Sequence, residues 1–423
     1  MSEYLMCLWD GGGSVPPELS IAKALLGRGH EVRALADVVL HDELRAAGVE
    51  PVPWTSAPQR TDPDPRQALA RDWEPRTPGG KLAAPVDEVW CGPAERFAAD
   101  VRAELRRRPA DAVVTCGFLT GALIGARAHG VPVAALQPQP FCGPGMGVPP
   151  FGPGWRPRSD AVGRLRDRLG WRMTSRMLDR GLPAVNAARE ANGLPPVPGV
   201  GMALGDADRV LVLTSRAFEY PSYSPPPHVL VTGPRLDDPA WAGDWRPPAG
   251  DAPLVLVGLS STYMAQEALL QRAVDALGRL PVRGLVTTGP AVDPASVRAP
   301  ANVTVVRGAP HAAVLREAAA VVTHGGHGTV IKAMAAGVPA LVLPMWRDQH
   351  EIAARVVFHG AGRRLRAGAG AGRIAASVRA LLDDPSHRAA ARRLAAAIEA
   401  ERAQDRAVEE LEALAAQRAP AVA

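Results

Sequence analysis

The residues His324 to Thr329, HGGHGT, place glycines beside hydrogen-bond donors directly after an apolar run that predicts a strand. Glycines let backbone N–H groups approach an anion, and a helix that begins here adds unpaired N–H groups and a favourable dipole. The His324 ring and the Thr329 hydroxyl can donate further hydrogen bonds to phosphate oxygens. The segment therefore predicts a phosphate-binding turn.

A second group suited to polar ligands follows the next apolar run, LVLPM. Asp348 and Gln349 are adjacent, and the pair suits sugar hydroxyls because Asp accepts hydrogen bonds while Gln both donates and accepts them. We expect no metal site, because His324 and His327 have no third ligand nearby in the sequence and their glycines favour an anion. Asp206-Ala-Asp208 precedes a predicted strand, which indicates capping or turn chemistry.

The glycines Gly11 to Gly13 follow the first apolar run and form a second candidate for a phosphate cradle. A dinucleotide-binding fingerprint would need a glycine three residues after Gly13, where this chain has Pro16. We therefore interpret these glycines as a tight turn at a substrate cleft, and Ser14 as the residue at its mouth.

Composition indicates an ordinary globular protein. The 423 residues are 47% hydrophobic and 22% charged, and 48 Lys and Arg oppose 43 Asp and Glu. The longest basic cluster, Arg106 to Arg108, ends a predicted helix, where cations suit the dipole, so we expect no nucleic-acid partner. Four scattered cysteines without a C-x-x-C pair are typical of a reducing cytoplasm. With no signal peptide and no run of about 20 apolar residues, we expect a cytoplasmic protein without a membrane span.

The elements that must position these residues alternate between short apolar strands and helical patterns in both halves of the chain. Such alternation predicts parallel sheets with helices on both faces. We predict two tandem doubly wound, Rossmann-like α/β domains over 1–205 and 254–395. A strand and a Pro-rich interdomain segment cover 206–253, and a helical tail covers 396–423. The Pro/Gly-rich loop from Gln137 to Arg158 is too long for a simple connection, which indicates a functional loop.

The motifs HGGHGT, GVPALVLP and DQ, in this order, resemble the donor-binding signature of family 1 glycosyltransferases. RGHEV, VLVGLSS and NVTVVRGAPHAAVL also occur in the expected order, so the resemblance covers essentially the whole chain. It implies a GT-B fold, in which an N-terminal acceptor-binding domain faces a C-terminal nucleotide-sugar-binding domain across a cleft. It also implies metal-independent transfer of a sugar from a UDP or dTDP donor, with inversion and without a cofactor.

The resemblance also assigns roles to single residues. The segment that would meet the nucleotide base lacks the aromatic residue often found there. The residues expected are Ser260, Ser261, His324, Gly326, His327, Gly328 and Thr329 for the diphosphate, Ala309 and His311 for the base, Asp348 and Gln349 for the sugar, and Phe118, Phe141, Met146 and Phe151 for the acceptor.

The base that activates the acceptor is not evident from these motifs. In this family it is usually a His in a G-H-x-x-P turn, paired with an Asp after the strand that corresponds to DAVVTC. Ser14 stands at the His position, and Cys116 or its neighbours stand at the Asp position. A serine hydroxyl is a poor base without a partner to deprotonate it. Asp10, at the end of the first strand, is the leading replacement, and Ser14 is the other catalytic candidate.

Three explanations for the missing dyad stay open. The base can lie elsewhere in the chain. The acceptor can need little activation, as a phenolate, an amine or an aromatic carbon that forms a C-glycoside would. The protein can also be a partner that binds nucleotide sugar without transferring it. A UDP-sugar 2-epimerase would share the architecture but needs acidic residues around the sugar. We expect an inverting glycosyltransferase of natural-product or antibiotic biosynthesis, acting on an aromatic or polyketide-like acceptor, as a monomer or homodimer.

Overall fold

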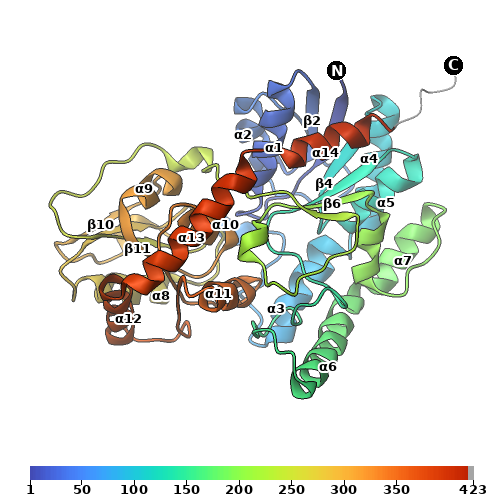
Figure 1. Cartoon of the computed structure of the whole chain (residues 1–423). Helices are drawn as coiled ribbons and strands as arrows, with labels where there is room; N and C mark the ends of the chain where they lie inside the picture. Colours follow the sequence, from blue (N-terminus) through green and yellow to red (C-terminus); the bar gives the residue numbers. More distant parts are fainter. Residues whose placement is uncertain (418–423) are drawn as a thin grey trace.

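The computed structural model describes residues 1–417, and the last six residues of the predicted 396–423 tail lie outside the described part. Two parallel sheets with flanking helices form two lobes (Figure 1). This architecture confirms the predicted α/β class with two Rossmann-like domains. The domain boundaries given above stay a prediction.

The first sheet has seven parallel strands in the order β3-β2-β1-β4-β5-β6-β7. Its last two strands come from the 206–253 segment, so part of that segment completes the first domain. The strands are β1 Glu3–Cys7, β2 Glu31–Ala36, β3 Glu50–Pro53, β4 Ala112–Cys116, β5 Val133–Gln137, β6 Arg209–Val212 and β7 Val229–Val231. The α-helices are α1 Val15–Gly27, α2 His41–Ala46, α3 Pro78–Pro85, α4 Ala94–Arg107, α5 Thr120–His129, α6 Ala161–Leu178 and α7 Leu182–Ala191.

The second sheet has six parallel strands in the order β10-β9-β8-β11-β12-β13. Its strands are β8 Leu254–Gly258, β9 Arg283–Thr287, β10 Val303–Val306, β11 Ala318–Thr323, β12 Ala340–Val342 and β13 Gly362–Arg364. The helices from here to the end of the described residues are α8 Glu267–Leu277, α9 His311–Glu317, α10 His327–Ala335, α11 Gln349–Phe358, α12 Ala371–Asp383, α13 Pro385–Arg402 and α14 Arg406–Ala415.

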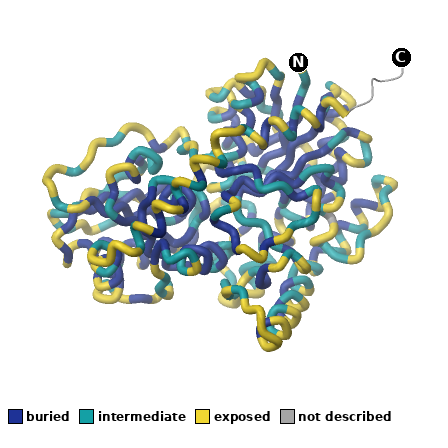
Figure 2. The backbone as a smooth tube through the Cα atoms, in the orientation of Figure 1, coloured by how far each residue is buried: buried dark blue, intermediate teal, exposed yellow. Residues whose placement is uncertain are grey.

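Apolar runs of four to six residues form the central strands, because helices cover both faces of each sheet. Every residue of β4, β5 and β8 is buried, as expected for parallel strands between helix layers. Figure 2 shows this buried interior in both lobes. The C-terminal helices join the lobes: Leu394 of α13 packs in the second core, and Leu411 of α14 packs beside Tyr4 in the first (Figure 1). Within residues 1–417, no helix has the length and apolar character to cross a membrane.

Strand order determines where ligands can bind. The order in which the strands are added reverses between β1 and β4 in the first sheet, and between β8 and β11 in the second. Open α/β sheets bind ligands outside the carboxyl ends of the strands at such switch points. The four loops that follow these strands carry Gly11 to Ser14, Gly117 to Phe118, Ser260 to Ser261, and His324 to Gly326. Both switch points therefore carry the residues singled out by their chemistry.

Candidate active site

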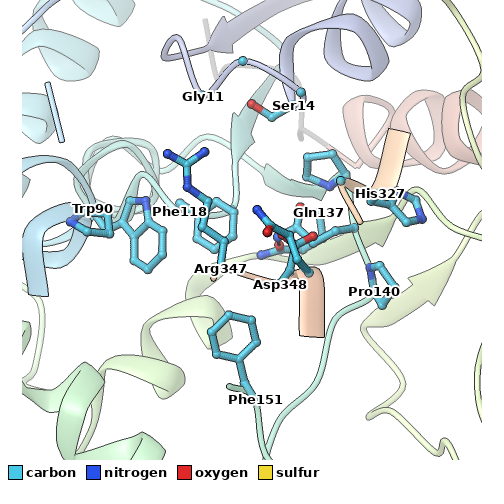
Figure 3. Close-up of a pocket in the computed structure, with 18 of the residues that line it drawn as sticks. Gly11, Ser14, Trp90, Phe118, Gln137, Pro140, Phe151, His327, Arg347 and Asp348 are labelled. Atoms are coloured by element: carbon cyan, nitrogen blue, oxygen red, sulfur yellow. Dashed lines mark hydrogen bonds between the residues drawn. The ribbon is translucent and has the colours of Figure 1, made fainter. Parts of the chain in front are cut away.

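A cavity of about 2070 Å³ lies between the two domains and is lined by loops from both switch points. Figure 3 shows Ser14, Phe118, Asp348 and Phe151 surrounding a common space. Every residue predicted for the site lines this cavity: Asp10, Ser14, Phe118, Phe141, Met146, Phe151, Ser260, Ser261, Ala309, His311, His324, Gly326, His327, Gly328, Thr329, Asp348 and Gln349.

The HGGHGT turn has the geometry of an anion site. Helix α10 begins at His327, directly after Gly326, and its first N–H groups have no carbonyl four residues earlier within the helix. Gly325 adopts φ +100°, and a Cβ there would lie 2.7 Å from Cγ1 of Val342, so only glycine fits. The turn thus aims backbone donors and the positive end of the α10 dipole into the cavity.

The two histidines of this turn are buried and neutral. Burial lowers the pKa of both His324 and His327 to about 3. The His324 ring donates to the carbonyl of Gly258, and Nε2 of His327 lies 2.9 Å from the Thr214 hydroxyl. A bound diphosphate would favour the charged imidazolium, which has a second N–H to donate.

The turn after β1 packs against the loop after β8. A Cβ on Gly12, whose φ is +70°, would lie 2.3 Å from Cγ2 of Thr262 and 3.3 Å from Oγ of Ser261. Oγ of Ser260 lies 3.0 Å from the Thr262 hydroxyl and accepts the Thr262 N–H, which shapes that loop. The first-strand glycines therefore allow a close approach of the two domains.

His311 lines the cavity beside the turn. Its Nε2 lies 2.9 Å from the Thr287 hydroxyl, and burial lowers its pKa to about 4. Ala309 is buried just before it. Lys332 of α10, which was not predicted, also lines the cavity and forms a 2.6 Å ion pair with Asp238. It brings a cation to the same wall.

Asp348 and Gln349 begin helix α11 at the cavity edge. Burial raises the pKa of Asp348 to about 6. Oε1 of Gln349 accepts the N–H groups of Met345 and Trp346 at 2.8 and 3.2 Å, so this side chain shapes the loop before α11. Asp348 has the freer polar group of the two.

Arg347 also lines the cavity, although no sequence motif indicates it. It is one of two non-glycine residues with positive φ within residues 1–417, and its guanidinium contacts Asp72 of the first domain and the Thr262 hydroxyl at 3.0 Å. The side chain enters the cavity beside Asp348 (Figure 3). The positive φ of Arg347 distinguishes this residue in the structure, and sequence patterns do not reveal it.

The first-domain wall of the cavity is aromatic. The rings of Trp90 and Phe118 stack with centroids 4.6 Å apart and an interplanar angle of 16°. Phe141 and Met146 come from the Pro/Gly-rich loop, and Phe151 lies across the cavity from Ser14 (Figure 3). This wall suits a flat aromatic ligand, because large apolar surfaces and stacked rings bind one another.

The two catalytic candidates differ in their surroundings. The Asp10 carboxylate accepts a hydrogen bond from Arg60 and another from the Gly12 N–H at 3.2 Å, so both oxygens are engaged. The Ser14 hydroxyl is buried and bonds to no group among the described residues. The structure also contains a buried carboxyl, Glu18, one helical turn after Ser14. Its i+4 spacing on an apolar helix face was the signal that could have revealed it.

Side chains that could bind a metal ion do not cluster in the described part of the chain. Within residues 1–417, no three His, Cys, Asp or Glu side chains are placed to hold a metal ion. Asp206 and Asp208 form ion pairs with Arg189 and Arg127 instead.

Residues 271–414 match the family model of the erythromycin biosynthesis protein CIII-like C-terminal domain. The chain is 31% identical over 404 residues to 4'-demethylrebeccamycin synthase of Lentzea aerocolonigenes, covering 93% of this chain and 94% of that protein. It is 29% identical over 415 residues to oleandomycin glycosyltransferase of Streptomyces antibioticus, covering 95% and 88%.

Solved structures share the fold. The glycotransferase of kitacinnamycin superposes with a TM-score of 0.75 at 24% identity, over 98% of both chains. Glycosyltransferase VinC in complex with dTDP superposes with a TM-score of 0.67 at 21% identity, over 98% of this chain and all of the other.

Proposed function

Since the chain belongs to the family 1 glycosyltransferases that modify natural products, we propose that it transfers a sugar from a dTDP- or UDP-activated donor to a flat aromatic natural product. The transfer inverts the anomeric carbon and uses neither a metal nor a cofactor. The observation that carries this proposal is the pairing of two walls in one cavity: the HGGHGT turn on one side and the stacked Trp90 and Phe118 rings on the other.

The donor binds with its diphosphate at the amino end of α10. The backbone N–H groups of His327, Gly328 and Thr329 then face the charge that grows on the leaving oxygen. His324 adds a donor when the negative charge of the diphosphate favours its protonated ring, which takes its proton from solvent, and Lys332 lies one helical turn further along α10. The dTDP complex of VinC, which shares this fold, supports a dTDP donor here.

The sugar then lies toward Asp348, with the acceptor against the aromatic wall. A neutral nucleophile attacks the anomeric carbon from the face opposite the diphosphate, so the configuration inverts. The partly buried Asp348 carboxyl can accept hydrogen bonds from sugar hydroxyls. The aromatic rings exclude water from the other side, which favours transfer over hydrolysis.

The test is release of nucleoside diphosphate that depends on an acceptor. Purified protein is incubated with dTDP-glucose or UDP-glucose and a panel of polycyclic phenols and indoles, and products are identified by mass spectrometry. We expect dTDP or UDP and one new glycoside in equal amounts. Sugar epimerisation without an acceptor, or nucleotide binding without any release, would contradict the proposal. Asp348→Ala should abolish turnover.

A further inference from the structure

Glu18 is a fully buried carboxyl in the first turns of α1, with 0% of its surface exposed. Neither of its oxygens accepts a hydrogen bond from an N–H or O–H group within residues 1–417. An unpaired polar group in a core costs free energy, and the same helix face otherwise carries Val15, Leu19 and Leu25. Packing alone gives no reason for a carboxyl here.

Ser14 is the second polar group without a structural task. It occupies the N-cap position of α1, where a serine usually accepts the N–H of the second or third helical residue. Those residues are Pro16 and Pro17, which have no N–H. The Ser14 side chain makes no capping bond, its oxygen is buried without a partner, and the residue lines the cavity (Figure 3).

The two groups share one helix face and one small polar cluster. Glu18 follows Ser14 by four residues, which places both on one face of α1, one helical turn apart, and neither the Ser14 hydroxyl nor the Glu18 carboxyl is bonded to the other in this structure. The Cys116 thiol, at the end of β4, lies beside the Glu18 carboxyl and beside the indole of Trp9. A Cβ on Gly11 would lie 2.6 Å from Oγ of Ser14 and 3.0 Å from the Trp9 ring, so Trp9 and Ser14 border the same space.

We propose that Ser14 and Glu18 form the proton relay of the transfer reaction, with Ser14 facing the acceptor and Glu18 accepting the proton behind it. This inference rests on the proposed function, and it places the missing base one helical turn inside the cavity wall.

The step conserves atoms and charge. The oxygen or nitrogen of the acceptor bonds to the anomeric carbon, and the bond from that carbon to the diphosphate oxygen breaks, so its electron pair leaves with the nucleotide. The acceptor proton passes to Oγ of Ser14 while the Ser14 proton passes to the Glu18 carboxylate. Glu18 ends as a neutral acid and returns its proton through Ser14, which lines the cavity, before the next turnover.

The surroundings of Glu18 suit this task. Burial raises the pKa of Glu18 to about 8, and Cys116 is the titratable group that faces it. Once ionised, such a carboxylate is a far stronger base than an exposed one. Burial also raises the pKa of the Cys116 thiol, so the thiol stays protonated and can donate to the carboxylate.

The kinetic test uses two acceptors of one shape and different acidity, 4-methylumbelliferone and its 6,8-difluoro derivative, with dTDP-glucose and UDP-glucose as donors. The fluorinated phenol is ionised under conditions where the parent is not, so it needs no base. We expect Glu18→Gln and Ser14→Ala to lower kcat for the parent about 100-fold or more. For the fluorinated acceptor we expect loss of no more than a few-fold, with unchanged dTDP affinity. With an aliphatic alcohol as acceptor, which does not ionise in this range, the rise of kcat/KM toward about pH 8 should vanish in Glu18→Gln and partly return in Glu18→Asp.

Ser20→Ala is the matched control, because Ser20 is a buried serine of the same helix that does not line the cavity. Its rates should equal those of the wild type. Unchanged kcat in Glu18→Gln, or equal losses for both acceptors in a folded variant, would overturn the relay. If Glu18→Gln does not fold, Ser14→Ala carries the same kinetic comparison, because removing its unbonded hydroxyl breaks no contact.

A measurement without substrate separates this inference from the proposed function. Infrared difference spectra of wild type against Glu18→Gln should show one carboxyl group that ionises near pH 8. The relay requires the Ser14 hydroxyl to turn toward Glu18 and donate to it once the carboxyl ionises, so in Ser14→Ala this ionisation should move to higher pH. An identical titration in Ser14→Ala would overturn the relay. A wild type that releases no nucleotide with any acceptor would instead contradict the proposed function.

Discussion

The guanidinium of Arg347 bonds to both carboxylate oxygens of Asp72 across the interdomain cleft, with Nε to Oδ2 at 2.6 Å and Nη2 to Oδ1 at 3.0 Å. Trp346 adds its indole N–H to the same carboxylate at 2.9 Å. Asp72 is 3% exposed, and Arg347 directly precedes Asp348. A contact from the first domain thus holds the segment that is proposed to bind the sugar.

Removing this contact should let the two domains move apart. Asp72→Ala leaves the Arg347 guanidinium without its partner, and a hydrogen bond to a charged group is worth about 1.5–3 kcal/mol. We expect a larger radius of gyration by small-angle scattering and a higher KM for the donor. Asp42→Ala, which breaks an exposed pair with Arg45, is the control. Equal scattering from Asp72→Ala and the wild type would contradict the role of this contact.

His324→Ala should weaken dTDP binding. The ring is buried at the phosphate-binding turn, and loss of one charge-assisted bond predicts about a tenfold or greater rise in Kd. Calorimetry with dTDP measures this directly. His359→Ala, a histidine that bonds to the Phe218 carbonyl and does not line the cavity, should bind dTDP as the wild type does. An unchanged Kd for His324→Ala would exclude its contact with the diphosphate.

Trp90→Ala should weaken acceptor binding and leave the nucleotide unaffected. Stacked aromatic contacts are worth about 0.5–1.5 kcal/mol beyond their buried area, which predicts at least a several-fold rise in acceptor KM. Trp155→Ala removes a ring that stacks under Arg166 and does not line the cavity, so its KM should not change. Equal acceptor KM values in both variants would remove Trp90 from the acceptor site.

Asp10→Asn tests the alternative base. Because Arg60 and the Gly12 N–H already engage the Asp10 carboxylate, we expect the dependence of kcat/KM on pH to persist in this variant. A flat pH profile with a loss of about 100-fold or more in kcat would make Asp10 the base instead.

Glu18 also predicts how stability depends on pH. Its pKa is about 8 in the folded protein against an ordinary value of 4.5, so the folded state holds the proton more tightly. Stability from this group is fully present below about pH 4.5 and is lost as pH rises through about 8. Relative to wild type, Glu18→Gln should therefore gain stability with rising pH, by a few kcal/mol at most, in denaturant unfolding. A constant difference across this range would contradict the shifted pKa.

The fold was predictable because its determinants are local. Apolar runs such as DAVVTC and PLVLVG, separated by helical patterns, predict parallel strands whatever their partners are. The HGGHGT turn was equally visible, because its glycines, donors and following helix are contiguous in the chain. The structure brings every predicted site residue to one cavity.

What the sequence did not reveal depends on contacts between distant residues. The pairing of Arg347 with Asp72 joins segments 275 positions apart, and no local pattern predicts it. The stacking of Trp90 on Phe118 likewise requires the turn before α4 to meet the loop after β4. The sequence shows that Glu18 follows Ser14 by four residues, but it does not show that the side chain is completely buried. Burial is what raises the pKa of this carboxyl.

A crystal structure with dTDP bound tests the central claim most directly, because the chain has two glycine-rich turns at the cavity. Our account predicts that the diphosphate contacts the N–H groups of His327 to Thr329 at the amino end of α10, with the sugar-facing phosphate toward Asp348. It also predicts that the Gly11 to Gly13 turn packs on Thr262 and leaves Ser14 facing the acceptor side. A diphosphate cradled by Gly11 to Gly13 would contradict it.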